Sequence, residues 1–140
     1  MKTNKSIFNY VDCIRIFIPD LEKGLEYYHH KLGLQIAWKT DSAIGLLMND
    51  DKTEIVIQNE DNREETDIKV DNVEDTIKTI TNAGGKVIYG PFDIKIGKCA
   101  VIEDPWNNKM VILDSTKGTF ITDKNGNIIG QNREKSSKCT

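Results

Sequence analysis

The turn at Asp104–Asn108, which reads DPWNN, is the clearest pointer to chemistry in the chain. In many small enzymes such a turn directly precedes a metal-binding carboxylate. The strand expected after this turn reads KMVILDS, and it contains Val111 and Asp114. Because side chains alternate between the two faces of a strand, Val111 and Asp114 point to opposite sides. The turn is present, and Asp114 is the carboxylate that follows it. Asp114 could serve this chemistry only if its side of the strand faces the site.

Arg15 and Cys13 are further candidates, and both stand on the same side of an expected first strand. The planar guanidinium of Arg15 could hold a carboxylate or phosphate. An ion pair of Arg15 with a carboxylate of the same face (Glu54, Glu65 or Asp67) is an equally good interpretation. Cys13 could be a nucleophile, but no base lies next to it in the sequence, which favours a buried structural thiol.

Three aromatic residues and two histidines are further candidates. Trp38 and Trp106 could stack on a flat ligand, although core or dimer packing is the commoner use of such side chains. Phe92 follows a proline and is expected to fill the core or line the rim of a pocket. His29 and His30 are consecutive on an expected helix, so they point about 100° apart and should not face one ion; we interpret them as surface or helix-end residues.

Composition limits the possible functions. The 140 residues are 38% hydrophobic and 29% charged, with a formal net charge of -3. This balance gives no electrostatic reason to expect nucleic acid as a partner. No apolar run approaches the ~18 residues that span a bilayer, and the first residues lack the apolar core of a secretory signal. We therefore expect a cytoplasmic protein, whose three cysteines (Cys13, Cys99 and Cys139) are reduced thiols.

Two similar segments, 52 positions apart, indicate an internal repeat. Each is a strand followed by a helix and three more strands, so each half is predicted to be β-α-β-β-β. The first helix should begin at Asp20, end at Gly33 and bury a stripe of Leu21, Leu25, Tyr28 and Leu32. The second should start from a capping box of Asp71 and Glu74. Halves of this length bury little alone and should pack together.

Strand alternation predicts which faces pack and which line a cavity. Ile14, Ile16 and Ile18 share one side of the first strand, and Ile55 and Ile57 share one side of a later strand. These aliphatic sides should lie under the helices. The opposite sides mix polar and apolar side chains, as a partly wet cavity does; an ordinary solvated sheet face would be mixed too.

These segments resemble the vicinal oxygen chelate superfamily, the fold of glyoxalase I, bleomycin-resistance proteins, fosfomycin-resistance enzymes and extradiol dioxygenases. The stretches that carry the resemblance run from about Val11 to Lys117: IFIPDLEKGLEYYHHKLGLQ, IKVDNVEDTIKTITNAGGKVIYGPFDI and AVIEDPWNNKMVIL. The resemblance implies an α+β fold in which two β-α-β-β-β repeats form a curved mixed sheet around a cavity, with helices on the outer face. It does not fix an activity.

The resemblance also implies where a metal would bind, because metalloenzymes of the superfamily use four cavity-facing ligand positions. In this sequence they fall on Cys13, Gln58, Glu65 and Val111. Glu65 is an ordinary ligand, Cys13 a possible soft one and Gln58 a poor one, whereas Val111 cannot bind metal. We therefore expect no metal and no cofactor. At the ligand position after the DPWNN turn, the chain has the aliphatic side chain of Val111 in place of a metal ligand.

The expected organisation is a flexible N-terminus (1–9), one domain (10–117) with repeats at about 10–60 and 64–117, an added hairpin (118–130) and a disordered tail (131–140). Asn125-Gly126 between two β-rich runs is the hairpin signal. The added hairpin should cover a sheet edge or extend an interface.

The sequence favours a metal-independent small-molecule binding protein, closest to bleomycin-resistance-like or uncharacterised glyoxalase-like members. It would hold a polar, partly aromatic ligand with Cys13, Arg15, Trp38, Gln58, Glu65, Phe92 and Trp106. A glyoxalase-like metal-dependent lyase, or another enzyme of the superfamily with atypical ligands, is the alternative. A structural or regulatory dimer with a vestigial cavity is a third possibility. A homodimer is expected, with no membrane or nucleic-acid partner.

Overall fold

The computed structural model describes residues 6–132, which form two compact units. The first unit comprises residues 12–66 together with 119–132, and the second comprises residues 6–11 together with 67–118. Cys139 and most of the predicted tail (133–140), like residues 1–5, lie outside the described residues. Neither helix among residues 6–132 is long and apolar enough to cross a membrane.

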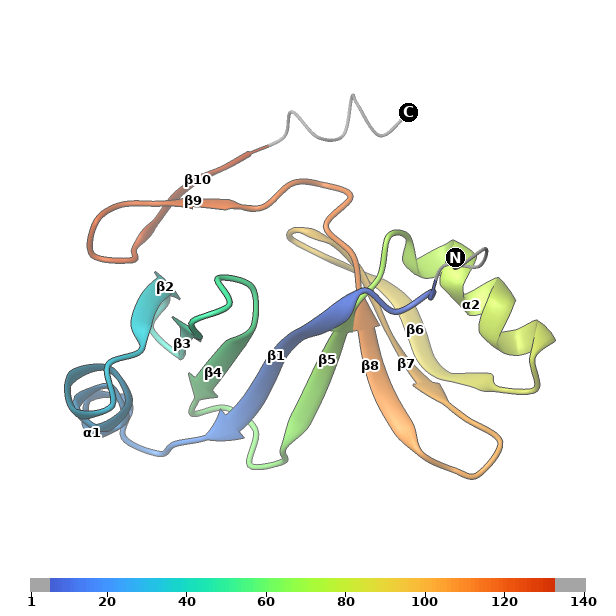
Figure 1. The fold of residues 1–140 in the computed structure, drawn as a ribbon, viewed down its shortest axis with the longest axis horizontal. Coiled ribbons are helices and arrows are strands. Elements are labelled where there is room, and N and C mark those ends of the chain that lie inside the picture. The colour runs from blue at the N-terminus through green and yellow to red at the C-terminus, as the bar shows by residue number, and fades with distance from the viewer. Residues whose placement is uncertain (1–5, 133–140) are drawn as a thin grey trace. The chain divides into compact units, whose positions relative to one another are not determined.

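The first unit contains a mixed four-stranded sheet in the order β2-β3-β4-β1 (Figure 1). The first strand, β1, runs parallel to β4, and the other neighbours are antiparallel. Its elements are β1 (Tyr10–Phe17), α1 (Leu21–Leu25), η1 (Glu26–Lys31), β2 (Gln35–Lys39), β3 (Ala43–Leu47) and β4 (Glu54–Gln58).

The helix of the first unit changes type halfway. Asp20 caps α1 by accepting hydrogen bonds from the backbone of Glu22 and Lys23, as the sequence predicts. The chain then continues as η1, a π-helix whose wider turn shifts the buried stripe. Leu32, predicted to be buried, is 53% exposed, and Leu34 packs against the core in its place. The prediction for Leu32 was wrong because it assumed 3.6 residues per turn throughout.

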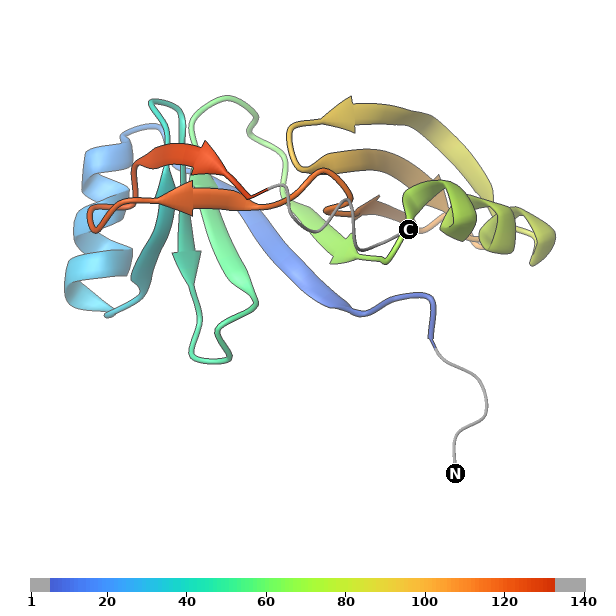
Figure 2. The ribbon, with the colours of Figure 1, turned by 90° about the horizontal axis from the view of Figure 1, so that it is seen from above.

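The helix covers one face of the first unit's sheet (Figure 2). Ile44, Leu46 and Ile57 are buried beneath it and contact Ile16 and Ile18. The predicted alternation of strand faces is confirmed here, because the aliphatic side of β1 and β4 is the side under the helix. Ile14, at the same parity, is 37% exposed.

The second unit repeats this connectivity, with its four strands in the order β5-β8-β7-β6 and β5 parallel to β8. The predicted α+β class, with β-α-β-β-β connectivity in both halves, is therefore confirmed. The elements are β5 (Glu65–Lys69), α2 (Val73–Asn82), β6 (Lys86–Ile94), β7 (Gly97–Glu103) and β8 (Lys109–Leu113).

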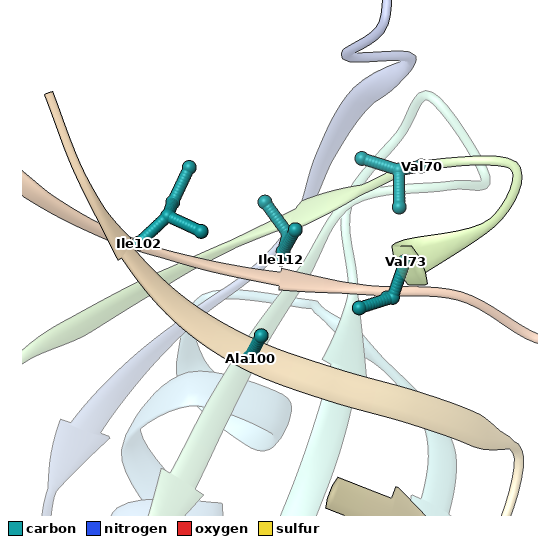
Figure 3. Close-up of a cluster of buried hydrophobic side chains, with 5 residues drawn as sticks. All are labelled: Val70, Val73, Ala100, Ile102 and Ile112. Atoms are coloured by element: carbon teal, nitrogen blue, oxygen red, sulfur yellow. The ribbon is translucent and has the colours of Figure 1, made fainter. Parts of the chain in front are cut away.

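The core of the second unit lies between α2 and its sheet. Figure 3 shows its five buried side chains converging from β7, β8 and the chain around the start of α2: Val70, Val73, Ala100, Ile102 and Ile112. Phe8, from the N-terminal segment, packs against the same cluster. Asn9 ties that segment down by donating its backbone N–H to Lys69 and its side-chain amide to Asp71.

The start of α2 differs from the expected capping box. Asn72, not Asp71, is the N-cap, and its side chain accepts from the backbone of Asp75. Asp71 is engaged with Asn9 instead. Asp114 supplies a second cap from a distant strand end, because its buried carboxylate accepts the backbone N–H of Val73. This carboxylate also accepts from Lys98 and Thr116, so Asp114 fastens α2 to the sheet.

A two-stranded hairpin of β9 (Phe120–Thr122) and β10 (Ile128–Gln131) follows. Its turn lies where Asn125-Gly126 predicts one, and Gly126 adopts φ +88°. Within the first unit the turn meets β2: Asn127 forms a bridge with Lys39. A side chain on Gly126 would overlap the side chain of Ile36, so only glycine permits this approach.

Candidate binding face on the first unit

The candidate site is the face of the first unit's sheet that lies opposite α1. Its centre is a small apolar cluster in which Cys13, Ala43 and Val56 are buried and Trp38 packs against them. These residues come from β1, β3, β4 and β2, so every strand of the sheet contributes. Cys13 therefore stands where alternation predicts it, as a buried thiol in an apolar setting.

Trp38 is held in place by two contacts. Its indole lies over Gly45, where any added side chain would overlap the ring. Its ring N–H donates to the carboxylate of Glu54 at 2.8 Å. A half-buried ring fixed by a directional bond keeps one orientation, and part of its surface remains accessible.

Arg15 lies two residues after Cys13 on β1 and so belongs to the same face. Of the two uses considered for Arg15, the structure shows an ion pair: Nε is 4.0 Å from Glu65 Oε2. That separation exceeds hydrogen-bond length. The two side chains are 28% and 36% exposed, so the pair is weak and solvated.

The loop after β4 adds a second, tighter pair beside Arg15. Arg63 donates Nε and one terminal N–H to Asp61, with a shortest contact of 2.7 Å. This hydrogen bonding holds the pKa of Asp61 at about 2, and the charge of Arg15 contributes a smaller lowering. The β1 edge of this face therefore has two ion pairs, Arg15 with Glu65 and Arg63 with Asp61.

Gln58 organises that loop. Its side chain is completely buried, and its carbonyl oxygen accepts the backbone N–H groups of Glu60 and Asp61, each at 2.8 Å. Its amide nitrogen donates to the carbonyl of Asp61. These bonds occupy the polar atoms of the side chain with its own loop, so Gln58 positions Asp61 and has little left to offer a ligand.

The four metal positions implied by the family resemblance do not form a suitable donor set. Cys13 packs in the apolar cluster, Gln58 is committed to its loop, and Glu65 faces Arg15. Val111, on β8, has no donor atom. Across residues 6–132 no three His, Cys, Asp or Glu side chains gather as a metal site requires. The residues present do not fit a divalent ion.

The remaining predicted ligand residues lie in the second unit. Phe92 is half-buried, pairs across the sheet with Cys99, and its ring centroid is 5.2 Å from that of Tyr89. Trp106 is 77% exposed on the turn after β7. Its backbone N–H is used by the turn itself, where it donates to Asp104.

The DPWNN turn is built as a hairpin connection. Asp104 Oδ1 accepts the backbone N–H groups of Trp106 and Asn108, Oδ2 accepts the side chain of Asn108, and Asn107 has φ +72°. The β9–β10 turn has the same bonds: Asp123 accepts from Asn125 and Asn127, with Gly126 at the positive φ. The motif therefore serves chain reversal in both places.

Sequence reasoning overlooked two features of this face. Glu54 was considered only as a partner for Arg15, whereas it anchors the Trp38 indole. Gly45 was not considered, although its lack of a side chain makes room for that ring. Strand alternation could have placed both residues on this face. Gly45 pairs with Val56 and Glu54 pairs with Cys13, and paired residues lie on the same face of a sheet.

A protein-family model supports the fold. The model described as the Glyoxalase/Bleomycin resistance protein/Dioxygenase superfamily matches residues 10–112. The match ends before the β9–β10 hairpin. No curated protein sequence matches the chain.

Solved structures share this fold at low sequence identity. Methylmalonyl-CoA epimerase from Mycobacterium tuberculosis has a TM-score of 0.66 at 12% identity, over 81% of this chain and 92% of the epimerase. A hypothetical protein from Bacillus halodurans has a TM-score of 0.62 at 17% identity, over 81% and 95% of the two chains. A homoprotocatechuate 2,3-dioxygenase variant from B. fuscum has a TM-score of 0.55 at 15% identity, over 90% of this chain and 34% of the dioxygenase.

Proposed function

Because the chain belongs to the Glyoxalase/Bleomycin resistance protein/Dioxygenase superfamily, we propose that it binds a small organic molecule without a metal ion. The observation that supports this proposal is one sheet face carrying both a fixed indole and a loosely paired guanidinium, Trp38 and Arg15. The ligand is polar and partly aromatic, and it carries a carboxylate or similar anion.

The Arg15–Glu65 pair makes an exchangeable anion site. An exposed ion pair is typically worth about 0–1 kcal/mol, so releasing Arg15 from Glu65 costs little. A ligand carboxylate can form two parallel hydrogen bonds to the guanidinium, which are shorter and stronger than the 4.0 Å contact it replaces. Trp38 then offers a flat apolar surface for the rest of the ligand.

A metal-dependent enzyme of the superfamily, such as a glyoxalase-like lyase, is the second candidate. Glu65 favours it, since a half-exposed carboxylate on β5 is an ordinary metal ligand. Stoichiometric binding of zinc, nickel or manganese, lost on Glu65→Gln, would support this candidate. Binding that is indifferent to metal would count against it.

The chain is further proposed to form a homodimer. Relatives of this length commonly pair their β-α-β-β-β units between copies, as the family resemblance implies. Light scattering after size-exclusion chromatography should give twice the chain mass of 15.9 kDa. The monomer mass at all accessible concentrations would reject the dimer.

Fluorescence tests the proposed binding face, because the chain has two tryptophans in different settings. Trp106→Phe leaves Trp38 as the reporter, and Trp38→Phe leaves the exposed Trp106 as a matched control. We use 4-nitrobenzoate as the probe and nitrobenzene as its uncharged counterpart. The expected result is saturable quenching of Trp38 by 4-nitrobenzoate, with weaker quenching by nitrobenzene.

Arg15→Gln should weaken 4-nitrobenzoate binding about tenfold and leave nitrobenzene unaffected, because it removes only the anion contact. Arg63→Gln is the matched control, since Arg63 is 82% exposed and is already paired with Asp61. Equal loss in both variants, or quenching of Trp106 rather than Trp38, would contradict the proposed face.

A further inference from the structure

A groove at the edge of β2 lies apart from the proposed binding face. It has a volume of about 430 Å³ and is bounded by the helix, β2 and the β9–β10 turn, all within the first unit. Its polar lining includes Lys39, Lys124, Gln35, Asn125, Asn127 and the histidines at 29 and 30. None of these residues belongs to the cluster around Trp38 and Arg15.

The β9–β10 turn, which forms the third wall of the groove, is held in a fixed position against β2. Gly126 sits against Ile36 at a distance that only glycine permits, and Asn127 bridges to Lys39. The turn is stiffened by Asp123, which accepts the backbone N–H groups of Asn125 and Asn127 at 2.9 Å each. The hairpin that forms this wall lies outside the region that the family model matches, residues 10–112.

The charge of the groove is positive. Lys39 and Lys124 line it, and no carboxylate does. Within residues 6–132 neither lysine forms an ion pair, whereas other lysines such as Lys98 and Lys109 do. Asp123, in the turn next to Lys124, accepts hydrogen bonds from within the turn. These bonds, chiefly the one from the Asn127 backbone, lower the pKa of Asp123. Two uncompensated ammonium groups facing one hollow favour an anion.

The neutral lining suits an anion as well. In the part of the chain that the structure describes, the side-chain amides of Gln35 and Asn125 make no hydrogen bonds, so their N–H groups can donate to a ligand. His29 and His30 both border the groove, and their ring centroids are 4.8 Å apart. His29 Nδ1 donates to the carbonyl of Leu34 at 2.6 Å, which fixes that ring.

We propose that this groove binds a phosphate monoester. Lysine is a suitable point charge for a phosphoryl group, which carries close to two negative charges at neutral pH. The hollow is larger than a phosphate ion, and Leu25 and Ile36 add apolar surface to its lining. The phosphoryl group lies between Lys39 and Lys124, and the organic part of the ester rests on these two aliphatic side chains.

Amide NMR titrations of the full chain test the proposal with three probes at equal ionic strength: inorganic phosphate, phenyl phosphate and benzoate. Phenyl phosphate should cause saturable shifts at Gln35, Lys39, Asn125 and Asn127. Inorganic phosphate should shift the same residues more weakly, since it lacks the apolar part. Benzoate binding here as tightly as phenyl phosphate would overturn the assignment to a phosphoryl group, and free phosphate binding best would overturn the ester.

A double variant separates the groove from general charge. Lys39→Gln with Lys124→Gln should weaken phenyl phosphate binding about tenfold or more. Lys23→Gln with Lys78→Gln changes the net charge equally at exposed helical positions and should have little effect. Equal losses in the two double variants, or an unchanged affinity in the first, would overturn the proposal.

Gly126→Ala tests the groove's construction without touching a charge. The added methyl group meets Ile36 and the positive φ disfavours alanine, so the turn should move away from β2 and phenyl phosphate affinity should fall. Unchanged amide signals from β1 and β4, in the same unit as the groove, show whether that unit remains folded. A folded variant with full affinity would show that the hairpin does not form the site.

Discussion

At the scale of single residues, the same sheet face holds side chains used for folding and side chains available for binding. Gln58 and Arg15 are both polar and both predicted as ligand residues. Gln58 is fully buried, and its side-chain amide is hydrogen-bonded to the loop after β4. Arg15 instead makes one long, solvated ion pair. Burial and hydrogen bonding, rather than residue type, separate the two roles.

Gln58→Leu should destabilise the fold by about 1–3 kcal/mol, because it removes three partly buried hydrogen bonds to the loop, from the backbone N–H groups of Glu60 and Asp61 and to the carbonyl of Asp61. Urea unfolding followed by circular dichroism measures this loss. Gln35→Leu, at an exposed position, is the control and should change the unfolding free energy by less than about 0.5 kcal/mol. Equal stability of the two variants would contradict the role assigned to Gln58.

Asp93 provides a pH-dependent test. Hydrogen bonds from Lys98 and then Lys117 hold its pKa at about 2, below the ordinary 3.8. The folded state binds this proton less readily than the unfolded chain, so the pairing stabilises the fold above about pH 4 and is lost as pH falls toward 2.

Carbon-13 NMR titration of the Asp93 carboxyl group measures this pKa directly. Lys98→Gln with Lys117→Gln should raise it toward 3.8, whereas the pKa of Asp61, set by Arg63, should stay at about 2. An Asp93 pKa of 3.8 in the unmodified chain would show that the pairing is absent in solution.

At the scale of elements, turns and glycine positions place the functional side chains. The two five-residue turns that start at Asp104 and Asp123 share one hydrogen-bond pattern, but the residue with positive φ is Asn107 in one and Gly126 in the other. Gly45 makes room on β3 for the Trp38 indole. Asn107, Gly126 and Gly45 are uncharged, so substitutions there test backbone and packing geometry without removing a charge.

Asn107→Gly should stabilise the chain by about 0.5–1 kcal/mol, since glycine adopts positive φ without steric cost. Asn108→Ala should do the opposite by about 1 kcal/mol, because it removes the side-chain bond to Asp104. Thermal unfolding of both variants checks the signs. Destabilisation by Asn107→Gly would mean that the Asn107 side chain has a role beyond the turn geometry.

Gly45→Ala should displace the Trp38 ring, break its bond to Glu54 and cost about 1–3 kcal/mol. In the Trp106→Phe background the emission maximum should move to longer wavelength as the indole becomes more exposed. Gly130→Ala is the matched control, because its added methyl group would meet only an ordinary contact with Ile121. An unchanged emission spectrum in Gly45→Ala would contradict the placement of Trp38.

At the scale of the whole molecule, the sequence was sufficient to predict the α+β class, the order of elements and the faces under the helices. Alternation and helical periodicity are local signals, and residues such as Ile16, Ile57 and Ile68 follow them. The shift from Leu32 to Leu34 was not predictable in this way, because a π-helix breaks the period on which the inference depends.

The site was less predictable than the fold, since alternation places a side chain on a face but does not say what it bonds. Cys13 and Arg15 stand on the predicted side, yet the bonds of Trp38 to Glu54 and of Gln58 to its loop depend on contacts across strands and turns. Asp114 shows the same limit: its carboxylate caps α2 from 41 residues away.

Calorimetric titration of the chain with 4-nitrobenzoate, in the presence of EDTA and then with added zinc, nickel or manganese, tests the proposal of metal-independent binding most directly. We expect the dissociation constant for 4-nitrobenzoate to stay within about twofold under all these conditions and to rise in Arg15→Gln. Binding that disappears in EDTA, returns with one ion per chain and is abolished by Glu65→Gln would contradict it.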